Sequence, residues 1–462
     1  MEWPGAGFEE VPGQRKVSEA APGAGDGGTP EDPAVGPGSE GARVSEHGEA
    51  AGEALTIYAR LAVTGEKVAK VALRSDDTAA ALREAVEGKV GGGTLRVVFE
   101  QTLLEGPTLL SKLGLYDYAT VFVSRPLPRL VLTADSAGGA RLWCTRIGKT
   151  KFLLKGHISQ VHSAVFSADG ATVLTASADG SARLWSTTDG SCFRVLEDHE
   201  AAVRSATFSP DGALIATASE DGTVKLWCTH SHECLRTLSG HQDKVSSAAF
   251  SSDGQQLVTA SSDTTAKIWS TDVGVCFQTL THESVVQAAQ FSPGDAVVLS
   301  SSLDHDPRLW NAETGEWLCE LSGHTGMVMQ AAFSPDGRTV ATACQDGTAA
   351  LWRARRGRCV HVLRGHEAQV THVAFSRCGA AVVTSSADRT ARIWDVTTGS
   401  CRHTLSGHQH QVFSAVFSSS GHDVATASLD GTARLWSADN GECSQTFKGH
   451  FSGVLAVDFS PY

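Results

Sequence analysis

The sequence predicts a mainly β protein, most of which consists of one repeated structural unit. Eight tryptophans recur at intervals of 41 or 42 residues between Trp143 and Trp436. The last seven each stand 28 residues after a histidine, beginning with His157 and Trp185, and an eighth histidine, His450, continues the series near the C-terminus. A fixed period of this length indicates stacked copies of one supersecondary unit.

Each period has the pattern of four short strands. In the first complete unit, alternation of apolar and polar residues predicts strands at 161–167, 172–177, 182–185 and 192–196, separated by turns such as Asp179-Gly180. A single four-stranded sheet leaves two faces and two edges exposed, whereas a radial arrangement of such sheets buries the faces against one another. Residues 127–462 are therefore predicted to form a β-propeller.

The two ends of the repeat region predict how the ring closes. Residues 129–133, 140–143 and 151–154 match the second to fourth strands of a unit that lacks its first strand. Residues 453–460 match a first strand with nothing after it. The two remnants make one divided unit beside seven complete ones, which predicts an eight-bladed propeller closed by the C-terminal strand. Seven blades with two frayed ends is the alternative.

These repeats resemble the WD40 family over residues 127–462. The resemblance rests on Asp-Gly turns, on strand ends such as Arg-Leu-Trp, and on recurring Gly-His pairs. The pairs end at His157, His241, His324, His366, His408 and His450. Asp198 and Thr281 replace the glycine in the other two units, and only Trp394-Asp395 has the eponymous dipeptide.

The resemblance implies a hydrogen-bonded tetrad of histidine, serine or threonine, aspartate and tryptophan in each blade. Two of the implied sets are His157, Thr175, Asp179 and Trp185, and His366, Thr384, Asp388 and Trp394. The others pair His199 with Asp221, His241 with Asp263, His282 with Asp304, His324 with Asp346, and His408 with Asp430. The closing blade would join His450 to Thr133 and Trp143, but Ala137 stands at its aspartate position, so this blade is expected to be the least rigid.

Histidine, hydroxyl and carboxylate together imitate a catalytic triad. Seven or eight equivalent copies, each tied to an indole, indicate a structural role, and no distinct polar constellation stands apart from them. We therefore expect no catalytic residue, cofactor or small-molecule substrate. The chain has eleven cysteines and no C-x-x-C pair, and six of the cysteines share one repeat position, which predicts no metal site and free, buried thiols.

The N-terminal third has two further predicted parts. Residues 1–52 are rich in glycine and proline, with ten acidic and three basic residues among the first fifty, which is typical of a disordered leader. Residues 54–124 have the order hairpin, helix, strands, and with motifs such as Thr-Leu-Arg-Val-Val-Phe they resemble the ubiquitin-like β-grasp fold. That resemblance implies a partner-docking patch centred on the strand of Val98. Conjugation is not expected, because the chain continues through Pro126 into the repeats.

A binding face is predicted where the residues break the uniformity of the repeat. The position after each Gly-His-x-x-x-Val element rims the central channel of a propeller; these residues are His162, Arg204, Ser246, Gln287, Met329, Thr371, Phe413 and Leu455. Apolar members and their neighbours form two groups. The first contains Phe413, Leu429, Phe451, Leu455 and Ile158, and the second contains Met327, Met329 and Leu303. Arg204 and Glu220 mark a polar sector, and the basic turn Arg353–Arg358 on the opposite face is a second candidate, for an acidic segment.

Composition narrows the function further. Most of the net charge of −13 lies in the leader, so no basic footprint for nucleic acid or anionic lipid is expected, and no apolar run is long enough for a membrane helix. No secretory signal pattern precedes the first domain, so a cytoplasmic protein is expected, with nuclear or cytoskeletal placement as alternatives. The expected function is a non-catalytic scaffold whose propeller rim binds a protein or peptide while the ubiquitin-like domain recruits a second partner. The alternatives are an adaptor in ubiquitin and proteasome degradation, and, by similarity to other WD40 proteins, a centriole, cilium or microtubule assembly factor.

Overall fold

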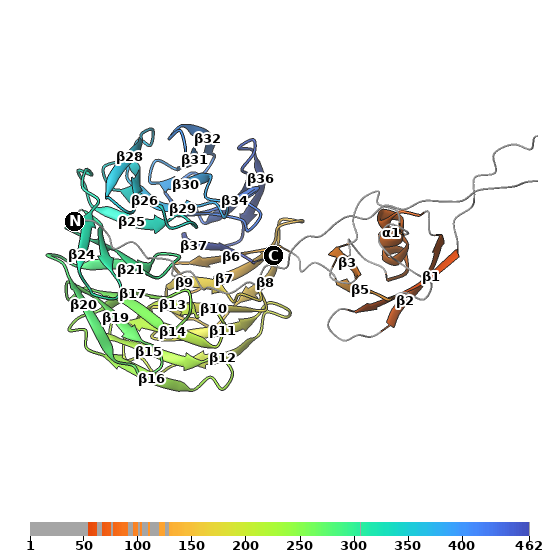
Figure 1. The fold of residues 1–462 in the computed structure, drawn as a ribbon, viewed down its shortest axis with the longest axis horizontal. Coiled ribbons are helices and arrows are strands. Elements are labelled where there is room, and N and C mark those ends of the chain that lie inside the picture. The colour runs from red at the N-terminus through yellow and green to blue at the C-terminus, as the bar shows by residue number, and fades with distance from the viewer. Residues whose placement is uncertain are drawn as a thin grey trace, which may run out of the picture.

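The structure is a computed structural model. It describes residues 54–61, 67–74, 77–90, 96–99, 102–103, 110, 120–124, 129–304 and 306–461 (Figure 1). The predicted leader, residues 1–52, lies outside the described residues. No helix in the described part of the chain is long and apolar enough to span a bilayer.

The N-terminal unit is a five-stranded sheet with one helix. Its elements are β1 (Ala54–Leu61), β2 (Lys67–Arg74), α1 (Ala79–Val90), β3 (Arg96–Phe99), β4 (Thr102–Leu103) and β5 (Thr120–Ser124). The strand order is β2-β1-β5-β3-β4, with β1 parallel to β5 and antiparallel to β2. Thr78 caps the helix, because its hydroxyl accepts a hydrogen bond from the Ala81 amide at 3.2 Å. Ile57, Val121 and Leu82 are fully buried and form part of the small core.

Residues 129–461 form eight four-stranded antiparallel sheets, which we number as blades 1 to 8 (Figure 1). Seven blades are continuous in sequence. Blade 1 is β9 (Val161–Phe166), β10 (Thr172–Ser177), β11 (Ala182–Ser186) and β12 (Cys192–Leu196); blade 2 is β13 (Val203–Phe208), β14 (Leu214–Ser219), β15 (Thr223–Cys228) and β16 (Cys234–Ser239); blade 3 is β17 (Val245–Phe250), β18 (Gln256–Ser261), β19 (Thr265–Ser270) and β20 (Cys276–Thr281); blade 4 is β21 (Val286–Phe291), β22 (Val297–Ser302), β23 (Arg308–Asn311) and β24 (Trp317–Glu320). Blade 5 is β25 (Val328–Phe333), β26 (Thr339–Cys344), β27 (Ala349–Arg353) and β28 (Arg358–Leu363); blade 6 is β29 (Val370–Phe375), β30 (Ala381–Ser386), β31 (Thr390–Asp395) and β32 (Cys401–Ser406); blade 7 is β33 (Val412–Phe417), β34 (Asp423–Ser428), β35 (Thr432–Ser437) and β36 (Cys443–Lys448).

Blade 8 is shared between two distant parts of the chain. The C-terminal strand β37 (Val454–Phe459) pairs with β6 (Leu130–Asp135), which is followed by β7 (Ala140–Cys144) and β8 (Lys149–Leu154). In this register Val457 lies opposite Thr133, and the Leu130 amide donates to the Ser460 hydroxyl at 2.9 Å. The divided blade predicted from the sequence is therefore present, and the alternative of seven blades with frayed ends is wrong.

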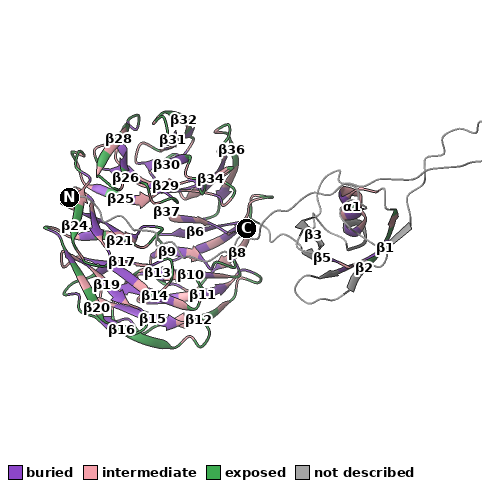
Figure 2. Cartoon of the chain, in the orientation of Figure 1, coloured by how far each residue is buried: buried purple, intermediate pink, exposed green. Residues whose placement is uncertain are grey.

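The burial of each strand follows its place in the blade. The second strand is buried at nearly every position, whereas the fourth strand forms the exposed outer edge (Figure 2). Each tryptophan packs into the interface with a neighbouring blade: Trp185 of blade 1 shares a cluster with Leu132 and Leu142 of blade 8. Ala176 and Ala182, small residues of the second and third strands, lie in the same manner between blades 1 and 2. The repeated tryptophan thus fixes the distance between blades, because a buried indole contributes a large apolar area.

Candidate protein-interaction site

The implied tetrad is present as a continuous hydrogen-bond chain in the regular blades. In blade 1 the Trp185 indole donates to the Thr175 hydroxyl at 2.8 Å, and that hydroxyl lies 2.8 Å from Nε2 of His157. Nδ1 of His157 donates to Asp179 at 2.8 Å. Blade 6 repeats this geometry with Trp394, Thr384, His366 and Asp388, where the corresponding distances are 2.8, 2.8 and 2.7 Å. When the threonine hydroxyl, which accepts from the indole, donates to Nε2, the histidine carries a proton on Nδ1 that faces the aspartate.

Electrostatics fit a structural role for these residues. Burial lowers the pKa of His157, and its hydrogen bond to Asp179 only partly offsets this effect. Burial would raise the pKa of Asp179, but the hydrogen bonds from Ser181 and His157 outweigh it and bring the pKa to about 2. The histidine and aspartate side chains are 1% and 4% exposed. Their polar atoms satisfy one another inside the blade, and this contact stabilises the fold without presenting a reactive group to solvent.

The closing blade corrects one expectation. Ala137 does stand at the usual aspartate position, yet His450 has a carboxylate partner: its Nδ1 lies 2.6 Å from Asp135, two residues earlier. Asp135 also accepts hydrogen bonds from the amides of Ala137 at 2.9 Å and Gly139 at 2.7 Å. The premise for a less rigid closing blade, a missing carboxylate, is therefore wrong. A residue aligned with the serine of other blades performs the task of their aspartate.

Blade 4 corrects a second expectation. His282 and Asp304 were implied as a complete pair, but Nδ1 of His282 is 3.6 Å from the carboxylate, and neither this nitrogen nor the two carboxylate oxygens have a hydrogen-bond partner among the described residues. In blade 1 the carboxylate is held by the amide and hydroxyl of Ser181, whereas blade 4 has Asp306 at that position. Asp304 instead forms an ion pair with Arg308 at 3.3 Å. Burial lowers the pKa of His282 to about 4.

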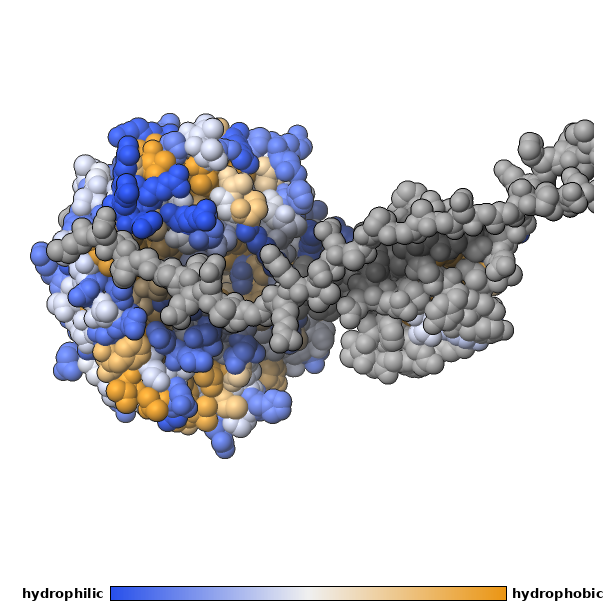
Figure 3. Space-filling view, viewed as in Figure 1, coloured by the Kyte–Doolittle hydropathy of each residue, from blue (hydrophilic) through white to orange (hydrophobic). Residues whose placement is uncertain are grey.

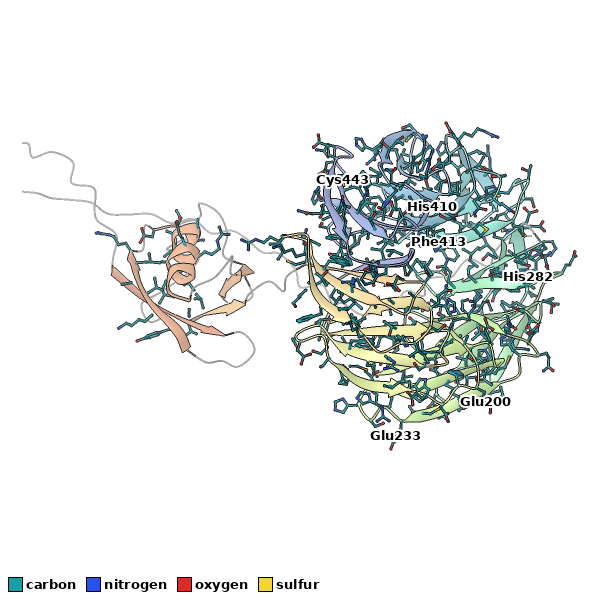
Figure 4. The ribbon with its side chains drawn as sticks, turned by 180° about the vertical axis from the view of Figure 1, so that it is seen from behind. Glu200, Glu233, His282, His410, Phe413 and Cys443 are labelled. Carbon is teal, nitrogen blue, oxygen red and sulfur yellow. The ribbon has the colours of Figure 1, made fainter. Side chains whose placement is uncertain are left out.

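The eleven cysteines are free thiols, as predicted, but the prediction that they are buried is wrong. Only Cys344 is buried. The six that share a repeat position begin the fourth strand of their blades, and Cys443 accordingly lies toward the outer edge of the ring (Figure 4). At Cys276 the thiol donates to the carbonyl of Gln278 at 3.2 Å, so it serves as a local hydrogen-bond donor at an exposed strand end.

One set of potential metal ligands lies within the described residues: His324, Cys344 and Asp346 of blade 5, whose donor atoms are all within 4.8 Å of one another. Cys344 stands where six other blades have serine and donates to the Gly326 carbonyl at 3.2 Å. Burial raises its pKa to about 11. The thiol therefore stays protonated at neutral pH, and the contacts are those of a serine substitute.

The predicted rim residues share one structural position. Each is the second residue of the inner strand of its blade, from His162 in β9 to Leu455 in β37. Figure 4 shows Phe413 toward the middle of the ring, in contrast with Glu233 at its edge. The rim is therefore made of eight comparable positions, and their chemistry differs around the circle.

The polar sector of the rim is an ion-pair network on blades 1 to 3. The Arg204 guanidinium lies 3.3 Å from both His162 and Glu220, and Lys244 lies 2.8 Å from Glu220. Lys244 lowers the pKa of Glu220 through its hydrogen bond, and burial followed by the Arg204 charge lowers the pKa of His162. These side chains satisfy one another at neutral pH.

The first apolar group lies on three consecutive blades, and we call it the rim patch. It consists of Phe413 and Leu429 of blade 7, Phe451 and Leu455 of blade 8, and Ile158 of blade 1. Phe451 is 98% exposed and Ile158 is 88% exposed. These two occupy the position after the tetrad histidine, where the other six blades have Glu, Gln or Thr. Leu429 and Leu455 are half-buried, and exposed apolar residues on adjacent blades mark a candidate docking surface.

Gly453 contributes to the shape of the rim patch. A Cβ at this position would lie 2.4 Å from the Leu429 side chain, so Leu429 packs over the glycine backbone. The other blades carry larger residues here, such as Lys244 or Met327. The absence of a side chain therefore places Leu429 against the loop that carries Phe451.

The remaining predicted surfaces are less extensive. Met329 is exposed on β25, while Met327 and Leu303 are half-buried. Arg353–Arg358 spans the turn between β27 and β28, as predicted. The backbone of Val98 lies in β3, paired with Leu103 and Phe122, and its side chain lies outside the described atoms.

Sequence reasoning missed an apolar belt on the outer edge of the propeller. Five consecutive blades expose a large apolar residue in the fourth strand, eight residues after the tryptophan, and these are Phe193, Leu235, Phe277, Leu318 and Val360. Apolar surface is visible at the lower edge of the propeller, near β16 and β20 (Figure 3). Blade 6 instead has Arg402 at this position. The recurrence of these apolar residues is visible in the sequence. The alternation of apolar and polar residues along an edge strand does not show, however, which face of the strand is buried against a neighbouring blade.

Comparison with known proteins agrees with this architecture. The family model described as WD domain, G-beta repeat matches residues 148–186, 190–228, 232–270, 274–311, 315–353, 357–395, 399–437 and 441–462. A crystal structure of the computationally designed Ika8 protein is similar at a TM-score of 0.60 and 30% identity, covering 66% of this chain and 91% of that one. The search of curated proteins gives no match.

The repeats therefore make this chain a member of the WD40 family. Propellers of this family generally mediate protein–protein interaction and are generally non-catalytic.

Proposed function

We propose that the protein is a non-catalytic scaffold whose rim patch binds a protein or peptide. One observation carries this proposal: Phe451 and Ile158 are almost fully exposed at the two adjacent blades where all equivalent positions elsewhere are polar. Phe413, Leu429 and Leu455 extend this surface toward the channel. A buried aromatic anchor surrounded by apolar contacts is the usual centre of a protein interface.

The surroundings of the rim patch favour an acidic partner segment. Lys448 ends the fourth strand of blade 7 and Lys155 follows the fourth strand of blade 8; they stand three residues before Phe451 and Ile158 respectively, and both are exposed. Neither forms an ion pair within the described residues. Two free cations beside an apolar surface complement a peptide in which acidic residues flank a hydrophobic anchor.

The experiment is a comparison of proximity-labelled proteins between wild type and Phe451→Asp with Phe413→Asp. Both residues lie on the surface, so the fold is expected to persist. Phe193→Asp is the matched control, because it places the same charge on an exposed phenylalanine of the outer belt. Loss of a set of labelled proteins only in the rim variant supports the proposal, and an unchanged set contradicts it.

The N-terminal unit supports a second element of the proposal, recruitment of another partner by a ubiquitin-like domain. Its strand order β2-β1-β5-β3-β4, with parallel β1 and β5 and a helix after the first hairpin, is the order that a β-grasp domain requires. This observation also favours the alternative of an adaptor that delivers propeller-bound proteins to the ubiquitin and proteasome machinery. Deletion of residues 54–124 would then abolish co-purification of proteasome or ligase components while the rim partners stay bound. We propose a cytoplasmic location for either function.

A further inference from the structure

Positive charge is concentrated in one sector of the propeller face opposite the rim. The strands of each blade are antiparallel, so the turns that join its first to its second strand and its third to its fourth strand lie on this face. In blades 5 and 6 these turns and the strand ends beside them carry six exposed arginines, which we call the arginine surface: Arg338, Arg353, Arg355, Arg356, Arg358 and Arg377. The corresponding segments of blades 1 to 4 contain acidic residues and no arginine or lysine. The charge is therefore a property of this sector and not of the repeat.

Most of the arginine surface lacks a carboxylate partner. Five of its members form no ion pair within the described residues, and these are Arg338, Arg353, Arg356, Arg358 and Arg377. The Asp336 carboxylate in the same sector accepts hydrogen bonds from the Ser334 hydroxyl at 2.6 Å and from the Arg338 amide at 3.1 Å, so it is held within its own turn. Guanidinium groups bind carboxylates in a bidentate manner, and several of them on one surface attract an acidic segment.

A pocket of about 460 Å³ lies within this sector, between blades 5 and 6. Its exposed lining residues are Pro335, Asp336, Arg353, Val360, Cys378 and Thr397. Val360 is 38% exposed, and Val396, which also lines the pocket, is half-buried. An apolar wall beside arginines fits a segment that combines an aromatic side chain with carboxylates.

We propose that the arginine surface and its pocket hold the first part of the chain's own leader, residues 2–11. This segment contains Trp3 and Phe8, which are the only aromatic residues among residues 1–52. It also contains Glu2, Glu9 and Glu10 and no basic residue. Its composition is therefore the complement of the site in both charge and apolar character.

The neighbouring positions of Phe8, Glu9 and Glu10 match the layout of the site. Phe8 would enter the pocket against Val360 and Val396. Glu9 and Glu10 would then lie beside the guanidinium groups of the turn after β27, where Arg353 and Arg356 are three residues apart. Hydrogen bonds between charged groups of this kind are about twice as strong as those between neutral groups.

Attachment to the same chain favours this occupant over a separate partner. Residues 12–53 lie between the docking segment and β1, and an extended chain of this length spans up to about 140 Å. The propeller has a radius of gyration of about 20 Å for its chain length, so the segment can reach either face. Tethering also raises the effective concentration of a weakly binding segment. The arginine surface and the rim patch lie on opposite faces, so this inference does not depend on the function proposed above.

The natural thiol of Cys378 provides the test. Residues 1–52 contain no cysteine, so Gly7→Cys introduces a single thiol beside Phe8 in the full chain. In a buffer of reduced and oxidised glutathione, we expect a disulfide between the introduced thiol and Cys378, identified by peptide mass mapping. The hydrogen bond from Ser376 lowers the pKa of Cys378 and makes its thiol more reactive, so Ser39→Cys, outside the docking segment, is the matched control.

The preference for one thiol measures docking. The disulfide to Cys378 should form at least about tenfold more in Gly7→Cys than in Ser39→Cys, because docking raises the local concentration of the introduced thiol. Other exposed cysteines, Cys234, Cys401 and Cys443, report random encounter and should react equally in the two variants. Equal yields at Cys378 in both variants would overturn the proposal. A disulfide that joins two chains in dilute protein would also overturn it, because the occupant would then be a second copy.

Charge reversal tests the role of the arginines. Arg353→Glu with Arg356→Glu, in the Gly7→Cys chain, should lower the yield at Cys378 about tenfold. Glu9→Arg with Glu10→Arg in the same chain should restore it, because the opposite charges are then exchanged across the contact. All four residues are outside the propeller core, and an unchanged melting temperature confirms that the fold persists. An unchanged yield in the arginine variant, or no recovery on the second reversal, would refute the assignment.

Discussion

Replacement of Asp135 tests whether one carboxylate closes the ring. In the variant Asp135→Ser, the residue that other blades have at this position, Nδ1 of His450 loses its partner at 2.6 Å, and the amides of Ala137 and Gly139 lose theirs. Hydrogen bonds to a charged group contribute about 1.5–3 kcal/mol each and are not additive, and an orphaned buried donor costs about 1–3 kcal/mol. We therefore expect about 3 kcal/mol of local destabilisation.

The assay is native-state amide exchange in β6 and β37. A change of this size accelerates exchange about 100-fold in these two strands, with little change in blades 3 and 4, because β37 is joined to β6 only by pairing between distant segments. The control is the double variant Asp135→Ser with Ala137→Asp, which rebuilds the arrangement of Asp179 in blade 1. It should recover all but about 1 kcal/mol, because Gly139 lacks the hydroxyl with which Ser181 donates to that aspartate at 2.7 Å. Exchange within threefold of wild type in the single variant would refute the reasoning.

Three further predictions concern pH and packing. Burial raises the pKa of Asp458 to about 6, so the folded state keeps a proton that the unfolded state releases, and the contribution of this group to stability falls as pH rises from about 4 to 6; in urea midpoints measured across that range, Asp458→Asn should make the change from pH 4 to pH 6 more favourable than in wild type, and an unchanged difference would contradict the assignment. Burial lowers the pKa of His282 to about 4, so the unfolded state binds the proton first and the contribution of this group falls as pH drops from about 6.5 to 4; His282→Gln should change the same difference in the opposite direction, and an unchanged difference would contradict the assignment. Gly453→Ala should displace Leu429, which lies 2.4 Å from the new Cβ, and weaken rim binding while lowering stability by less than about 1 kcal/mol; equal partner affinity would show that Leu429 is not part of the interface.

Periodicity was sufficient to predict the blades because every unit buries the same residues in the same way. The tryptophan spacing fixed their number, and the strand remnants at both ends predicted that β37 completes the blade of β6. Position matching also found the tetrads of blades 1 and 6. In blades 8 and 4 position matching predicted the wrong carboxylate contact for the tetrad histidine. Matching assigns a role to a sequence position, whereas a hydrogen bond depends on where the carboxylate atoms lie.

Asp135 reaches His450 from a position two residues away from the matched one, and Asp304 does not reach His282 from the matched one. The exposure of the cysteines was likewise mispredicted, because a fourth strand has no neighbour on its outer side. Hydrogen-bond partners and side-chain exposure depend on the distances between segments, and the sequence alone does not give these distances.

By itself the sequence predicted the fold class, an eight-bladed ring with a seven-bladed alternative, and the residues at the channel rim. These follow from local patterns that repeat with a fixed period. Only the tertiary structure decided which rim residues are exposed and how the closing blade obtains its carboxylate. The physical reason is that a repeat specifies what each blade shares, while function depends on the contacts made where one blade differs from the other seven.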